Sequence, residues 1–146
     1  MSRVIALDHG ERRIGVAMAD RETGMAFARP AIRRRRLEAI LTEVAELCAR
    51  EGAELVVIGL PRNMDGSEGV QAQRARAFGE ALAARGLRVV YEDERLSSWD
   101  ATQRLAAAGR RPSRASGELD SAAARLILQQ YLDARGEGPR HPEETE

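Results

Sequence analysis

The order of apolar segments along the chain constrains its fold more than any other sequence feature. Residues 4–7, 14–19 and 25–32 are three short, largely apolar runs, and the polar turn between the first two contains Gly10. Runs of this kind joined by turns of hairpin length are typical of antiparallel strands. Pro30 favours a sheet edge or a strand end for the third run, because proline cannot donate a ladder hydrogen bond. The chain therefore begins with a predicted three-stranded meander.

Two helix-strand units follow the meander. Apolar residues recur three and four apart over 37–50, which predicts a helix, and residues 55–58 form a short buried strand. The same pair repeats as a helix over 70–85 and a strand over 87–91. The order of elements up to this point is β-β-β-α-β-α-β.

Two further helices are expected to close the domain. The first covers 97–108, where Ser97 and Asp100 have the spacing of a capping box, and the second covers 118–134. The whole order predicts an α/β fold with a five-stranded mixed sheet, three antiparallel strands followed by two α-β units, flanked by helices. It is similar to the order found in ribonuclease H-like (RNase H-like) folds, in which the first strand lies centrally.

Length and composition fit a single domain. The chain has 146 residues, 43% of them hydrophobic. We expect one domain over residues 1–134 and a disordered tail over 135–146, which lacks apolar residues. No segment is long and apolar enough to cross a bilayer, and a strand begins almost at the first residue. These features predict a cytoplasmic protein without a signal peptide or a membrane partner.

Three carboxylates stand where predicted elements end or begin. Asp8 follows the first strand, Glu94 follows the last strand, and Asp120 lies in the first turn of the last helix. Parallel neighbouring strands open their carboxyl ends on one side of a sheet, which would bring Asp8 and Glu94 together. If all three met, the oxygen-only site would select Mg²⁺ or Mn²⁺ and suit phosphodiester hydrolysis, because one Cys and two His are too few for a zinc cluster.

Each of these acids also has a structural interpretation. Asp8 before a glycine is typical of a turn cap, and Asp120 would stabilise a helix N-terminus without any metal. Glu94 belongs to an acidic strand end, and Asp93 remains open as the ligand in its place.

All 23 basic residues are arginines, and several follow the same strand ends. Arginine can donate two parallel hydrogen bonds to a phosphate. The glycine-containing loop 59–67 follows a strand at the same side of the sheet, and it would either approach phosphate closely or serve as a packing turn. The run 33–36 stays open between a solvated surface and nucleic-acid contact. The candidates for binding a nucleic-acid backbone are Arg12, Arg13, Arg62, Asn63, Arg95, Arg110, Arg111 and Arg114.

Four segments, 8–17, 59–66, 93–97 and 120–123, closely resemble motifs of the bacterial YqgF family, also called RuvX. The resemblance covers residues 1–134. It implies an RNase H-like fold similar to the RuvC resolvases, and a nuclease that matures the 5′ end of small-subunit (16S) ribosomal RNA precursor. The family's acids match Asp8, Glu94 and Asp120. Departures are His9, where the family more often has an apolar residue, an aromatic residue or proline, and Arg12, where lysine is usual.

The resemblance implies ribosomal RNA precursor as the main partner. Further expected partners are the ribosome, branched or single-stranded DNA and a second copy of the chain. One alternative is a Holliday junction resolvase, a dimeric nuclease with a fourth acid near its last helix. Here the positions three residues from Asp120 are Gly117 and Ala123, although Glu118 is nearby. A non-catalytic RNA- or ribosome-binding adaptor is another alternative. An actin-like ATPase would need a second lobe for which this chain is too short.

Overall fold

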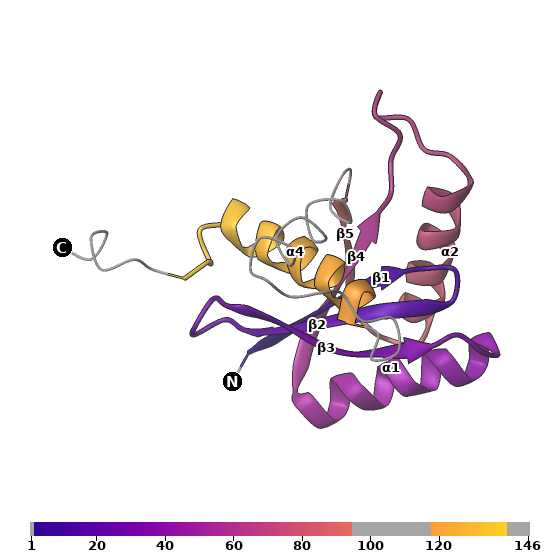
Figure 1. Ribbon diagram of the computed structural model, residues 1–146. Helices are drawn as coiled ribbons and strands as arrows, with labels where there is room; N and C mark the ends of the chain where they lie inside the picture. Colours follow the sequence, from indigo (N-terminus) through magenta and orange to yellow (C-terminus); the bar gives the residue numbers. More distant parts are fainter. Residues whose placement is uncertain (1, 95–117, 140–146) are drawn as a thin grey trace.

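The computed structural model of the chain describes residues 2–94 and 118–139. Its five strands are β1 (Arg3–His9), β2 (Arg13–Asp20), β3 (Ala26–Arg33), β4 (Ala53–Leu60) and β5 (Val89–Asp93). The helices are α1 (Leu37–Glu51), α2 (Val70–Ala84) and α4 (Glu118–Ala134) (Figure 1). The helix expected over 97–108 lies outside the described residues.

The five strands form one mixed sheet in the order β3-β2-β1-β4-β5. β1 pairs antiparallel with β2, and β2 with β3, whereas β1–β4 and β4–β5 are parallel. The predicted meander, the central first strand and the two α-β units are therefore confirmed. β5 begins two residues later than expected, after the positive-φ turn at Gly86, and it ends at Asp93.

The prediction that Pro30 marks an edge strand is also confirmed. β3 lies at the end of the strand order, and its register against β2 shifts between Ile14 and Val16, so that no partner is assigned to Pro30. A missing N–H is tolerated at such an irregularity because no ladder bond is lost there.

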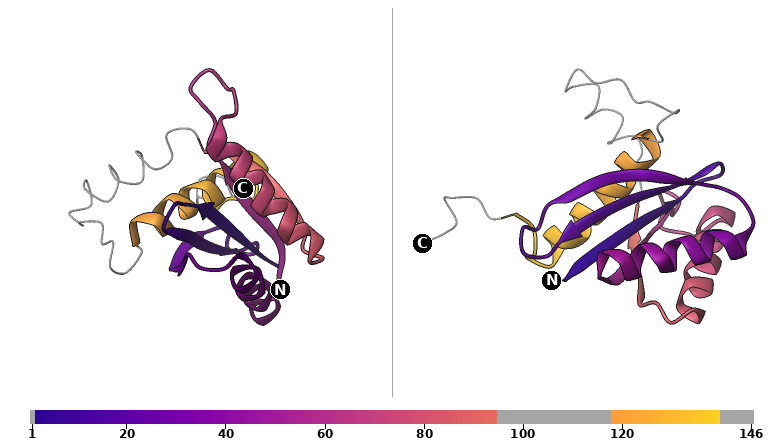
Figure 2. Two further views of the ribbon diagram at one scale, coloured as in Figure 1. Left: turned by 90° about the vertical axis from the view of Figure 1, so that its right-hand side faces the viewer. Right: turned by 90° about the horizontal axis from the view of Figure 1, so that it is seen from below.

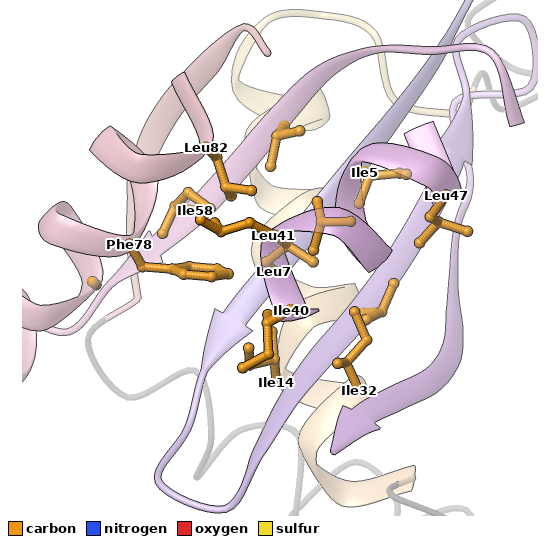
Figure 3. Close-up of a cluster of buried hydrophobic side chains, with 14 of the residues drawn as sticks. Ile5, Leu7, Ile14, Ile32, Ile40, Leu41, Leu47, Ile58, Phe78 and Leu82 are labelled. Atoms are coloured by element: carbon orange, nitrogen blue, oxygen red, sulfur yellow. The ribbon is translucent and has the colours of Figure 1, made fainter. Parts of the chain in front are cut away.

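Alternate residues of the strands build two separate hydrophobic layers. Ile5 and Leu7 of β1 pack on one face against α1 and α2, and Val4 and Ala6 pack on the other face against α4. The left-hand view in Figure 2 shows α4 on one side of the strands and α1 and α2 on the other. Figure 3 shows the first layer, in which Leu7 and Ile58 lie between the strands and the ring of Phe78. Because β1 is covered on both faces, it carries an uninterrupted apolar run.

The sheet has two ends with different compositions. At the carboxyl end β1, β4 and β5 finish, β2 begins and β3 finishes. The amino end lies opposite, where α1 finishes at Glu51 and the chain beyond α4 folds back so that the Glu137 N–H donates to Leu132 O. The predicted domain limit at residue 134 stays a prediction. In the described ranges no helix is long and apolar enough to span a membrane.

Candidate active site

Asp8 is the next-to-last residue of β1, at the carboxyl end of the sheet. Strand alternation places it on the face of Val4 and Ala6, beneath α4, and its cross-strand partner in β2 is Gly15. The carboxylate is half-buried. Asp8 thus lies at the centre of the sheet, with β4 on one side and the start of β2 on the other.

Glu94 follows β5 directly, and its backbone N–H donates to Leu60 O at 3.1 Å, which holds it against the end of β4. Its side chain lies over Gly59. A methyl group at that position would collide with the Glu94 carboxylate and with Ile127 of α4. Gly59 is therefore a close-approach glycine, and its missing side chain makes the space for a carboxylate beneath α4.

The face alternation of β5 separates Glu94 from Asp93. Val89 and Tyr91 pack with the layer under α1 and α2, whereas Val90 packs with the layer under α4. Glu92 also faces α4, since its Oε2 accepts from Gln130 Nε2 at 2.8 Å. Continued alternation carries Glu94 to the side of Asp8 and Asp93 to the other side, which favours Glu94 as the ligand.

Asp8 and Glu94 interact directly. The pKa of the Glu94 carboxyl is raised to about 9, first by burial and then by the charge of Asp8, a hydrogen bond with Asp8 and the charge of Asp93. Two carboxyl groups this close in a poorly solvated site do not both ionise readily, and they hold a proton between them.

The pair fits a hard divalent cation. Its donors are oxygen only, and Glu94 Oε2 is buried with no hydrogen-bond partner among the described residues. A buried acceptor without a donor is costly, and a cation would satisfy it. No cluster of three acidic, histidine or cysteine side chains with metal-binding spacing occurs within the described part of the chain.

Asp120 is the third residue of α4, and its side chain lies outside what the structure describes. The next residue, Ser121, is buried, and its hydroxyl donates to Arg29 O while accepting from the Val16 N–H at 3.3 Å. Val16 follows Gly15, the cross-strand partner of Asp8. The first turn of α4 is thereby fixed beside the strand end that carries Asp8.

Loop 61–69 joins β4 to α2 and extends beyond the sheet (Figure 1). Arg62 forms an isolated bridge with Glu68 and an ion pair with it at 3.5 Å, while Arg76 binds both oxygens of Glu68 at 2.7 Å. The Asn63 side chain donates to Ser67 Oγ at 3.0 Å. Both predicted phosphate-binding side chains thus take part in closing the loop, which supports its interpretation as a packing turn.

The remaining candidates for backbone contact divide into two groups. Arg12 and Arg13 lie in and after the β1–β2 turn, at the same end of the sheet as Asp8. Arg95, Arg110, Arg111 and Arg114 lie outside the described residues.

His9 does not join the acids. It faces the layer opposite to Asp8, where its ring centroid lies 4.8 Å from that of Phe78. Burial, followed by the charges of Arg34 and Arg74, lowers the pKa of His9 to about 4, so that the imidazole is neutral at pH 7. It is a partly buried turn residue rather than a partner of Asp8.

Two contributors were missed by sequence reasoning alone. Gly59 makes room for Glu94, and Ser121 fixes the start of α4 against the β2–β3 irregularity. A glycine inside an otherwise apolar strand was the only local signal for the first. The Ser121 contacts join residues 92 and 105 positions apart, so no local pattern pointed to the second.

Comparison with known proteins identifies the family of the chain. A model of the RuvX family, described as Holliday junction resolvase, matches residues 2–134. The chain belongs to the RuvX family. Two proteins named "Putative pre-16S rRNA nuclease" are among its relatives. The one from Synechococcus sp. is 42% identical over 93% of this chain and 92% of its own length, and the one from Moorella thermoacetica is 44% identical over 92% and 97%.

Solved structures show the fold of this RuvX family member. RuvC of T. thermophilus in complex with a Holliday junction substrate has a TM-score of 0.58 at 15% identity, covering 95% of this chain and 99% of that chain. The large terminase nuclease of phage G20c has a TM-score of 0.56 at 14% identity, covering 88% and 81%. The likeness confirms the predicted RNase H-like fold.

Proposed function

We propose that this protein is a divalent-metal-dependent endonuclease that processes the 5′ end of 16S ribosomal RNA precursor in the cytoplasm. The observation that carries the proposal is the pair of Asp8 and Glu94 at the carboxyl end of a RuvC-like sheet, with a buried Glu94 oxygen that has no partner among the described residues. Membership in the RuvX family and relatives named as pre-16S rRNA nucleases support the reaction class and the substrate.

Asp8, Glu94 and Asp120 would hold one or two Mg²⁺ or Mn²⁺ ions. Such ions, when bound, lower the pKa of a water molecule and stabilise the departing oxygen of a phosphodiester. The chain's own contribution is to fix the ligands. Gly59 admits the Glu94 carboxylate, α4 covers it, and Ser121 positions the helix turn that contains Asp120.

Cleavage of a labelled precursor fragment that spans the 5′ end of 16S RNA tests the proposal. With Mg²⁺ or Mn²⁺ the wild type should cut at one position, and Asp8→Asn should lose about 10²–10³-fold in rate. Asp93→Asn is the matched control, since it removes the neighbouring carboxylate on the other face and should stay active. Equal activity of the wild type and Asp8→Asn would indicate a contaminating nuclease and refute the assignment.

Junction resolution is a second candidate function, because the matching family model is described as Holliday junction resolvase. It would require a homodimer, since two symmetric strands are cut. Measuring cleavage of a four-way DNA junction beside the RNA precursor, together with the molecular mass in solution, separates the two functions.

A non-catalytic adaptor would give a third pattern. The wild type would then bind precursor RNA with the same affinity as Asp8→Asn, and titration calorimetry with Mn²⁺ would detect no binding to either protein.

A further inference from the structure

Four arginines gather at the carboxyl end of the sheet, on the β3 side of Asp8. Arg12 lies in the β1–β2 turn, Arg13 begins β2, Arg33 ends β3, and Arg36 precedes α1. Arg13 and Arg33 are direct cross-strand partners, and the Arg34 N–H donates to Arg12 O at 3.0 Å, which joins the two segments. We refer to Arg12, Arg13, Arg33 and Arg36 as the arginine ridge.

No member of the arginine ridge forms an ion pair within the described part of the chain, and Arg12, Arg33 and Arg36 are exposed. Like charges directly opposite each other destabilise a sheet. The Arg13–Arg33 pair is therefore a local cost to folding that an anionic partner would remove.

Two arginines at the opposite end of the sheet are paired with glutamates. At the amino end Arg3 pairs with Glu51 at 2.7 Å, and Arg21 pairs with Glu54 at 3.1 Å. The chain carries as many acids as bases, 23 of each, so acids are available to pair with the ridge. Among the described residues none of these acids forms an ion pair with the ridge, which leaves its charge available to an anionic ligand.

The other two arginines of the run 33–36 have structural roles. Arg34 Nη1 donates to Gly10 O at 2.9 Å and closes the turn, and Arg35 pairs with Glu43 of α1. The run is thus neither a uniform solvated surface nor a uniform binding segment. Two side chains hold the backbone in place, and Arg33 and Arg36 are left for a ligand.

We propose that the arginine ridge binds the sugar-phosphate backbone of the nuclease substrate on the β3 side of the scissile bond. This inference rests on the proposed function. Guanidinium groups bind phosphate oxygens in pairs, and such contacts position a strand without reading its sequence. β1 and β3 are two strand spacings apart, about 10 Å, which corresponds to roughly three stacked nucleotides. The β3 end of the ridge therefore binds the backbone about three nucleotides from the cleavage site, and Arg12 and Arg13 bind it closer.

RNA binding by the double variant Arg33→Gln/Arg36→Gln tests the ridge. Fluorescence anisotropy with a labelled single-stranded precursor RNA is measured over a range of KCl, in an Asp8→Asn background so that the RNA stays intact. The double variant should bind roughly tenfold more weakly, and the slope of log Kd against log salt should fall by about 1.4, or ~0.7 for each lost phosphate contact.

The matched control is Arg50→Gln/Arg88→Gln, which removes the same charge near the amino end of the sheet, where both side chains are exposed. Its affinity and salt slope should equal those of the parent. If both double variants bound RNA equally weakly, net charge alone would explain the loss of affinity, and the proposed role of the arginine ridge would be overturned. The proposal would also be overturned if Arg33→Gln/Arg36→Gln had the same affinity and salt slope as the parent.

Substrate truncation gives an independent measurement. Shortening the RNA by four nucleotides on one side of the cleavage site should weaken binding to the parent, and the same truncation should have little effect on the ridge variant. If the losses of affinity from truncation and from the Arg33→Gln/Arg36→Gln substitutions were additive whichever side of the RNA was shortened, the proposal would be overturned. These outcomes are separate from those of the nuclease test, because the ridge can bind RNA that the protein does not cleave.

Discussion

Charged side chains are arranged differently at the two ends of the sheet. At the amino end, Arg3 and Arg21 pair with glutamates. At the carboxyl end, Glu94 lies beside Asp8 with one buried oxygen unpartnered in the described structure, and the arginine ridge forms no ion pair with the described acids. Charges that stabilise the fold are neutralised within the chain, whereas charges at the candidate active site are left for a ligand. This contrast leads to testable predictions for variants at both ends of the sheet.

Glu94→Gln should have the largest effect, and its effects on activity and stability should be opposite. Cleavage should fall by about 10²–10³-fold because a metal ligand is lost. The metal-free protein should become more stable by about 1–2 kcal/mol at neutral pH, because Glu94 must take up a proton on folding whereas glutamine needs none. Rate assays with Mn²⁺ and thermal unfolding in EDTA measure the two quantities. A destabilised variant would contradict the idea that this carboxylate is costly to the fold.

Gly59→Ala should disturb the same end through packing. The new methyl group would displace the Glu94 carboxylate and the Ile127 side chain, at a cost of about 1–3 kcal/mol. Activity should fall as well, since the ligand moves. Gly79→Ala is a useful comparison, because its methyl group would collide with the Tyr91 ring in the layer away from the acids. That variant should lose stability and keep its activity per folded molecule.

The stability of the metal-free protein should depend on pH through Glu94. The pKa of its carboxyl is raised in the folded state to about 9 from 4.5, so the folded protein binds more protons than the unfolded chain between these values. Stability should therefore fall as the pH rises across this window, by at most about 1.4 kcal/mol per pH unit for one proton. Urea unfolding in EDTA measures the slope, and Glu94→Gln should flatten it. A slope unchanged by Glu94→Gln would assign the effect to another group.

Glu51→Gln should have the smallest effect and the opposite sign to Glu94→Gln. Glu51 accepts from Arg3 at 2.7 Å and lies 3.7 Å from Arg29, and both arginines are partly exposed. Its loss should lower the free energy of unfolding by about 1 kcal/mol, a shift in Tm of roughly 2–4 °C, and leave cleavage unchanged. Differential scanning calorimetry and the rate assay check both. A loss of activity would show that the amino end is not purely structural.

Much of the architecture was predictable because it depends on local chemistry. Apolar runs and turn residues identified the described strands, and Pro30 identified β3 as an edge strand. The acids at strand ends were apparent for the same reason, since Asp8 and Glu94 directly follow apolar segments. The sequence left Asp93 open, because neighbouring carboxylates look equivalent until the two faces of β5 are assigned to different helices.

What the sequence by itself determined is the order of the elements, their apolar faces and the residue types available for chemistry. Those properties follow from periodicity and from turn preferences within a few residues. Only the tertiary structure decided which charges are compensated. Arg35 pairs with Glu43 eight residues away and Arg34 closes the turn at Gly10, while Arg33 and Arg36, which flank these two residues, keep their charge for a ligand. Pairing of this kind depends on distances between side chains brought together by packing, which neighbouring positions in the sequence do not reveal.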